Sequence, residues 1–276
     1  MRSVTYYTYL NILFLTLLIM SGSVGGLASE GVYYLAFLAP LAAAMLIHPA
    51  LKRQREEIAG VREEPMRPLA VDGKMMTLTL PLVAPTVLIT LGVSVGWSSL
   101  LSLTGLTAPA PSLTTPLRDA FESAVIPAIL EELLFRLVPL ALLLPYSPRV
   151  CVTVGALYFA LAHASLFTLP YALVAGLVLG LCSVCFRSIL PCLMIHLVNN
   201  VCSVLLMHYG SGEAVWWILG SLVAASILSL VILFLRRREY IELIRGAMKP
   251  VKREGMPSAF YLYVLLTVIL TLVSAV

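Results

Sequence analysis

The sequence predicts an all-α membrane protein, a polytopic helix bundle with about nine membrane segments and an embedded polar cavity. Hydrophobic residues make up 60% of the 276 residues and charged residues only 12%, and the mean hydropathy is +0.98. Soluble globular domains contain about 45–50% apolar and about 25% charged residues. No stretch between the apolar runs is long enough for a separate soluble domain, so residues 1–276 are expected to form a single transmembrane domain.

Apolar runs separated by turn or charge signals define the expected membrane segments. The first run resembles the core of a signal peptide, but a second apolar run follows it directly, so we interpret it as a transmembrane helix. Pro81 and Pro85 in the third segment and Pro127 and Pro139 in the fourth predict kinked or broken helices. The expected segments are 5–27, 31–50, 75–103, 117–145, 149–168, 170–187, 189–208, 214–235 and 258–276.

The positions of the basic residues predict the orientation of the chain in the cell membrane. If the N-terminus lies inside and nine segments alternate, all but two of the 18 Lys and Arg residues fall on the inner side. Basic residues near the membrane mark the cytoplasmic side, so we expect a cytoplasmic N-terminus and a C-terminus outside. The two most charged loops, 51–74 and 236–255, also carry several Glu residues and no aromatic stacking platform, so no nucleic-acid partner is expected.

Three polar side chains interrupt the fourth segment within the stretch EELLFR. Ionisable residues in membrane helices are costly, face protein or a water-filled cavity, and usually mark function. Glu132 and Arg136 are four residues apart and lie on one helix face, which predicts an ion pair. Glu131 is rotated about 100° from Glu132 and has Phe135 four residues later, so it is predicted to be unpaired. An unpaired carboxylate in an apolar environment binds a proton more readily than one in water, as a general base near neutral pH requires.

The same four-residue spacing occurs in two further segments. Phe159 and His163 share a face in the fifth segment, and His196 and Asn200 share a face in the seventh, where Asn199 is an alternative partner for His196. The helical rise places these side chains at depths compatible with that of Glu131, so we expect them to converge. His208, by contrast, lies near the end of a segment, where interfacial solvation explains it.

Activation of water is the chemistry that these residue types suggest. Glu131 and His163 could hold and deprotonate a water molecule, while His196 and Asn200 could donate hydrogen bonds to the developing oxyanion. Zinc bound by Glu131, His163 and His196 is the alternative, although the HExxH motif is absent. We predict no metal and no cofactor. The CxxC pair Cys182 and Cys185 is interpreted as two structural thiols, because no second Cys or His pair stands at zinc-finger spacing.

The ordered motifs EELLFR, FALAH and HLVNN resemble those of the CAAX protease and bacteriocin-processing (CPBP, or Abi) intramembrane peptidases, a family that includes the type II CAAX prenyl endopeptidases. The resemblance covers about 117–208, which would be the catalytic core. It implies a membrane-embedded hydrolytic cavity open towards the cytosol. It also implies Glu131 and His163 as the water-activating residues, His196 and Asn200 as oxyanion donors, and structural support from Glu132, Arg136 and Phe159.

The sequence thus predicts an intramembrane endopeptidase that acts on a peptide or lipidated peptide, with membrane lipids around it and CAAX-type C-terminal processing as one form of the activity. A zinc-dependent version of the same peptidase is one alternative. A non-catalytic membrane protein of the immunity or scaffold class is another. A proton-coupled transporter is disfavoured because the chain has neither repeated halves nor matched broken helices.

Overall fold

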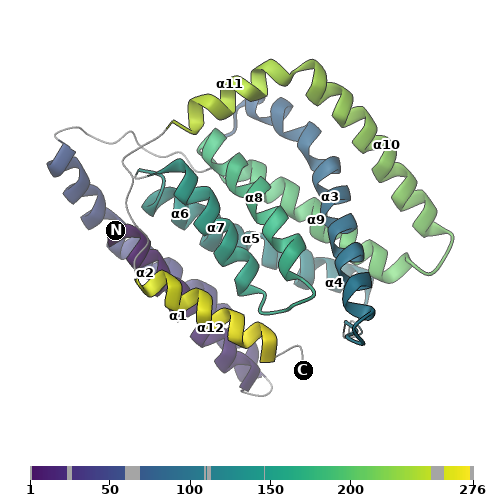
Figure 1. Cartoon of the computed structure of the whole chain (residues 1–276), viewed down its shortest axis with the longest axis horizontal. Coiled ribbons are helices and arrows are strands. Elements are labelled where there is room, and N and C mark those ends of the chain that lie inside the picture. Colours follow the sequence, from purple (N-terminus) through teal and green to yellow (C-terminus); the bar gives the residue numbers. More distant parts are fainter. Residues whose placement is uncertain are drawn as a thin grey trace.

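The computed structural model describes residues 2–23, 27–59, 69–108, 110, 113–145, 147–249 and 258–273, and every regular element in these ranges is a helix (Figure 1). Six of the helices are long and apolar enough to cross a membrane. The predicted fold class is therefore confirmed: the chain is a polytopic helical membrane protein. Parts of the two charged loops, 60–68 and 250–257, lie outside the described residues.

Most of the expected segments coincide with one helix each. Two helices, α7 and α12, are apolar but shorter than the other six, and the fourth expected segment is a series of short helices. The total of nine membrane segments stays a prediction. The helices outside the fourth segment are α1 (Arg2–Ser23), α2 (Leu27–Ala59), α3 (Gly73–Ser102), α7 (Pro148–Ala162), α8 (Leu169–Phe186), α9 (Leu190–Tyr209), α10 (Ala214–Leu235), α11 (Arg237–Ala247) and α12 (Ser258–Val273).

The fourth segment is helical from Pro116 to Leu142 but alternates between α- and π-helix along its length. Two π-helical stretches, η1 (Ala120–Val125) and η2 (Leu133–Leu137), interrupt it, and Pro127 and Pro139 stand at the beginnings of the α-helices that follow them. Proline has no N–H to donate and is tolerated in the first turn of a helix. Single π-turns occur frequently at functional sites, and here η2 follows Glu131 and Glu132 directly. The α-helices of this segment are α4 (Pro116–Asp119), α5 (Ile126–Glu132) and α6 (Val138–Leu142).

The third segment is not broken, because α3 continues as one helix through Pro81 and Pro85, and only the kinked form of the prediction remains for it. Pro81 cannot donate a hydrogen bond to the carbonyl of Thr77, four residues earlier. Arg236 Nη1 donates to that carbonyl at 3.0 Å, and the Tyr240 hydroxyl donates to the next one, Leu78, at 2.8 Å. Helix α11 was expected as a polar loop. It lies against the start of α3, where Arg236, just before α11, replaces the one donor that Pro81 removes and Tyr240 adds a second hydrogen bond.

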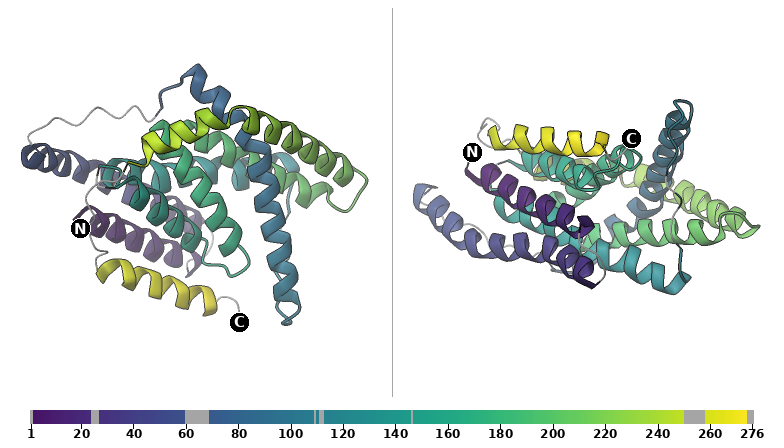
Figure 2. Two further views of the ribbon diagram at one scale, coloured as in Figure 1. Left: turned by 45° about the horizontal axis from the view of Figure 1, so that its top comes forward. Right: turned by 90° about the horizontal axis from the view of Figure 1, so that it is seen from below.

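The bundle has two ends that differ in the chain segments they contain (Figure 1). The start of α1, the end of α2 and the starts of α3 and α7 lie at one end, together with the end of α8 and with α11. We call this the basic end. The end of α3, the α7–α8 and α9–α10 connections and the end of α12 lie at the other, which we call the opposite end. Figure 2 shows the hairpin of α1 and α2 with α12 beside α1, packed on the side of α7 that faces away from α3.

Helices α7 and α8 approach each other closely through small residues. A Cβ atom built on Gly176 of α8 would lie 3.0 Å from both Cα and O of Ala156 on α7. Small residues at such crossings let two membrane helices approach backbone to backbone, which strengthens van der Waals packing. Gly176 therefore fixes the distance between α7, which carries Phe159 and His163, and α8.

We expect Gly176→Ala to lower the stability of the detergent-solubilised protein by about 1–3 kcal/mol, the usual cost of overpacking a tight contact. Gly220→Ala on α10 is the matched control, because nothing lies within 4 Å of a Cβ built there. Because alanine has a higher helix propensity than glycine, the stability of the Gly220→Ala variant should be unchanged or slightly increased. Thermal denaturation of both variants tests this, and equal behaviour of the two would contradict the close approach of α7 and α8.

Candidate active site

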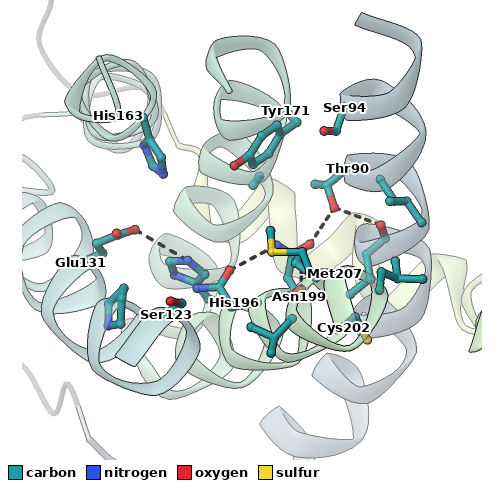
Figure 3. Close-up of a pocket in the computed structure, with 18 of the residues that line it drawn as sticks. Thr90, Ser94, Ser123, Glu131, His163, Tyr171, His196, Asn199, Cys202 and Met207 are labelled. Carbon is teal, nitrogen blue, oxygen red and sulfur yellow. Dashed lines mark hydrogen bonds and ion pairs between the residues drawn. The ribbon is translucent and has the colours of Figure 1, made fainter. Parts of the chain in front are cut away.

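A cavity of about 600 Å³ lies inside the bundle and collects the predicted catalytic residues (Figure 3). Glu131, His163, His196 and Asn200 all line it, and so does Phe159. They come from α5, from α7 and the residue after it, and from α9, and parts of α2, α3, α4, η1 and α8 also contribute to the wall. Side chains from three separately predicted segments thus meet in one space. Polar residues that also line the cavity are Thr86, Thr90, Ser94, Asp119, Glu122, Ser123, Tyr171, Asn199 and Ser203.

Glu131 presents a carboxylate to this cavity from the last turn of α5. Its side chain is 15% exposed, and its Oε2 atom is buried without a hydrogen-bond partner among the described residues. The prediction that Glu131 is unpaired is wrong in one respect, because its Oε2 lies 3.7 Å from His196 Nε2. That distance is an electrostatic contact and is too long for a hydrogen bond. The carboxylate oxygen therefore keeps its capacity to accept a proton or a hydrogen bond from a bound molecule.

Glu132 and Arg136 form the predicted ion pair, with Arg136 Nε 3.4 Å from Glu132 Oε2 and both side chains 1% exposed. The other oxygen, Glu132 Oε1, accepts a hydrogen bond of 2.8 Å from His196 Nδ1. The guanidinium lies 4.6 Å from the centre of the Phe159 ring, a distance at which cation–π attraction acts. Neither Glu132 nor Arg136 lines the cavity. They contact His196 and Phe159 on the side that faces away from the cavity and towards the basic end.

His163 follows the last residue of α7, and its ring is held by the backbone of the preceding turn. Nδ1 lies 2.9 Å from the carbonyl oxygen of Phe159. A carbonyl can only accept, so Nδ1 carries the hydrogen and Nε2 of the neutral ring has a free lone pair. The His163 side chain points into the cavity above Glu131 (Figure 3). The edge of Phe159 separates the two imidazoles, with ring centroids 5.0 Å from His163 and 5.5 Å from His196.

The two asparagines of α9 belong to a short chain of hydrogen bonds that begins on α3. The Thr90 hydroxyl donates to Asn199 Oδ1 at 2.7 Å, and Asn199 Nδ2 donates to Asn200 Oδ1 at 3.4 Å. Because Oδ1 of Asn200 accepts from its neighbour, its Nδ2 group remains available as a donor in the cavity. Thr90 gave no signal in the sequence, where Thr86 and Thr90 are ordinary membrane-helix threonines. Its link to Asn199 becomes visible only when α3 packs against α9.

We expect Thr90→Val to lower kcat for peptide cleavage by about tenfold with little change in KM, since removal of a well-placed oxyanion donor costs about 10²–10³ and mispositioning costs part of that. Valine keeps the shape of threonine but removes the hydroxyl that orients Asn199. Thr86→Val is the control, because the Thr86 hydroxyl donates to the carbonyl of Leu82 in its own helix. Equal activity of the two variants would contradict a positioning role for Thr90.

The zinc alternative requires Glu131, His163 and His196 to bind one ion. Among the described residues, no three His, Cys, Asp or Glu side chains are grouped closely enough to hold one metal ion. All five cysteines have free thiols, including Cys182 and Cys185.

A second polar cluster lies on the cavity wall near the opposite end of the bundle. His208 Nε2 lies 2.8 Å from Asp119 Oδ2, and Thr114 donates to the same carboxylate through both its hydroxyl and its backbone N–H. The interpretation of His208 as an interfacially solvated residue is therefore wrong, because it ties the end of α9 to α4. Nearby, Arg118 and Glu122 form an exposed ion pair at 2.8 Å.

Comparison with known proteins gives one match. Residues 114–202 match the model of the family described as type II CAAX prenyl endopeptidase Rce1-like. This range contains all three motifs and covers less than half of the chain. No curated protein and no solved structure matches. The match supports a membrane protease, and it confirms the resemblance of the cavity-forming part of this chain to the CAAX protease family.

Proposed function

We propose that this protein is an intramembrane endopeptidase that hydrolyses peptide bonds at or near the membrane, with CAAX-type C-terminal processing as one form of that reaction. One observation carries the proposal. A carboxylate oxygen without a hydrogen-bond partner, an imidazole nitrogen with a free lone pair and two potential oxyanion donors line the same cavity. These are the groups that attack by water on an acyl carbon requires.

Glu131 and His163 form the water-activating side of the cavity. A water molecule between the Glu131 carboxylate and His163 Nε2 would donate one hydrogen to each, because both groups are acceptors. Glu131 removes a proton as the water oxygen attacks the carbonyl carbon. The same proton then passes to the amide nitrogen when the C–N bond breaks. The products are a carboxylic acid and an amine, and the carboxylate of Glu131 is regenerated.

His196 and Asn200 form the side that receives the developing negative charge. The Nδ1–H group of His196 is committed to Glu132, so the ring offers Nε2 to the cavity. In the protonated form of the ring both nitrogens donate, so that Nε2 would donate into the cavity while Nδ1 stays on Glu132. Asn200 adds a neutral donor through Nδ2. Two donors that are already in place need no reorganisation when the oxyanion forms.

The substrate class follows from the lining of the cavity, which combines these polar groups with apolar side chains such as Val87, Leu91 and Leu179. Such a mixed lining suits an extended peptide, or a peptide that carries a lipid. No nucleic acid is implied. Membrane lipids surround the protein because apolar side chains cover the outward faces of its long helices.

Comparative mass spectrometry of membrane peptides tests this function. Cells that express the wild type should accumulate cleaved peptides that are absent when Glu131→Ala is expressed at the same level. The purified wild type should then cut the same sequences in detergent. If the Glu131→Ala and His163→Ala variants cut them equally well, the proposed function is wrong.

Two further outcomes separate the alternatives. Activity that is lost with a chelator and restored by zinc would indicate the zinc-dependent version of the peptidase. Binding or protection of a partner that persists in Glu131→Ala, with no cleavage by the wild type, would indicate a non-catalytic immunity or scaffold protein.

A further inference from the structure

The cavity is closed on one side and open on the other. Its floor is made by Leu179, Ile195 and His196, which are 1%, 1% and 6% exposed. Its mouth contains Leu113, Glu122, Ser123 and Met207, all of which are exposed. Two of these four are polar, so the mouth suits contact with water or lipid headgroups better than contact with hydrocarbon. A substrate therefore enters past η1 and the end of α9.

The mouth lies at the opposite end of the bundle (Figure 1). Met207 stands two residues before the end of α9, and Leu113 precedes the start of α4. Deeper in the cavity, Tyr171 lies near the start of α8 and His163 follows the end of α7, and both positions belong to the same half of the bundle. Figure 3 shows these two side chains on one side of the cavity and His196 on the other.

The route from the basic end is blocked by packed side chains. Phe135, Arg136 and Glu132 stand between the floor and that end, and each is 1% exposed. Arg136 lies over Phe159, and Phe135 contacts the edge of the same ring at a centroid distance of 5.7 Å. Entry from this side would require a buried ion pair and two aromatic rings to separate.

Charge distinguishes the two ends as clearly as shape does. Among the described residues, every Lys and Arg lies at the basic end except Arg118 at the mouth and Arg136 behind the floor. The opposite end instead carries acidic residues, namely Glu30, Asp119, Glu122 and Glu213. Lys and Arg near membrane surfaces mark the cytoplasmic side. This rule places the basic end in the cytoplasm and the mouth of the cavity on the other side.

We infer that the cavity is entered from the non-cytoplasmic face of the membrane, so that its substrates are peptide segments presented at that surface. The entry side rests on geometry and charge, whereas the nature of the substrate rests on the proposed function. The family resemblance alone implies a cavity open towards the cytosol. Entry from the non-cytoplasmic face and a cavity open towards the cytosol exclude each other, so locating the mouth on one side of the membrane decides between them.

Cysteine labelling in intact cells tests the entry side without any assay of cleavage. Glu122→Cys marks the mouth, Ser94→Cys marks the cavity wall on α3, and Arg245→Cys marks the basic end on α11. A membrane-impermeant maleimide should label the first two above the wild-type background in intact cells, and Arg245→Cys only after permeabilisation. The reverse pattern would overturn the inference. Met207→Cys, also at the mouth, replaces Glu122→Cys or Ser94→Cys if either variant does not accumulate.

A vesicle assay then joins the entry side to catalysis. The probe is a farnesylated CAAX peptide with a fluorophore and a quencher on either side of the bond to be cut. If detergent-solubilised protein cuts it in a Glu131-dependent manner, right-side-out vesicles should cut external peptide and inside-out vesicles should not. Cleavage only by inside-out vesicles refutes the entry side alone. Absence of cleavage in detergent counts against the proposed function, while the labelling result still decides the entry side.

Discussion

Replacement of Glu131 by glutamine is expected to lower kcat for peptide cleavage by about 10²–10⁴-fold, the usual contribution of a general base, while KM changes little. Glutamine keeps the size and one carbonyl oxygen of the side chain but cannot take a proton from water. The side chain is also only partly buried and has no strong structural partner, so the variant should fold normally. Single-turnover cleavage of the farnesylated CAAX probe measures the loss of catalysis, and thermal denaturation shows whether the variant folds normally.

Glu122→Gln is the matched control for this experiment. It makes the same change of side chain within the same cavity, but Glu122 lies at the mouth and is paired with Arg118. Its kcat should stay within a small factor of the wild-type value. A Glu131→Gln protein that is folded and as active as Glu122→Gln would remove Glu131 from the chemistry.

Local spacing predicted the contacts that one helix makes with itself. The Glu132–Arg136 pair and the contact between the Phe159 and His163 rings both follow from a separation of four residues, which a helix fixes whatever surrounds it. The composition predicted the fold class for a similar reason, because long apolar helices satisfy their own backbone in lipid.

Contacts between helices were not predictable from the same evidence. The four-residue spacing predicted only Arg136 as a partner of Glu132. In the structure α5 packs against α9, and the second carboxylate oxygen of Glu132 accepts a hydrogen bond from His196. The partnership of His208 with Asp119 joins residues 89 positions apart. The carbonyl that Pro81 frees in α3 accepts from Arg236, which stands directly before α11 in the charged stretch that was expected to be a loop. A single sequence carries no signal for such pairings.

The buried network behind the cavity should be the most sensitive part of the fold. Loss of one partner of a buried ion pair leaves the other charge uncompensated and costs about 3–5 kcal/mol. Arg136→Met removes the guanidinium from a site that is 1% exposed and leaves Glu132 with only the hydrogen bond from His196 beside it. Thermal denaturation of the solubilised variant should show a large loss of stability. Arg118→Met, at an exposed pair of the same spacing, should show little change.

The double variant Glu132→Gln/Arg136→Met separates an electrostatic origin of this loss from a simple loss of packing. If uncompensated charge causes it, removal of both charges should restore much of the stability that Arg136→Met loses, because neutral replacements of a buried pair are often tolerated. If packing of the arginine on Phe159 causes it, the double variant should be no more stable than Arg136→Met. The side-chain carbonyl of the Glu132→Gln substitution can still accept from His196 Nδ1, so cleavage by the double variant would further show whether His196 needs only a hydrogen-bond acceptor behind it or a full negative charge.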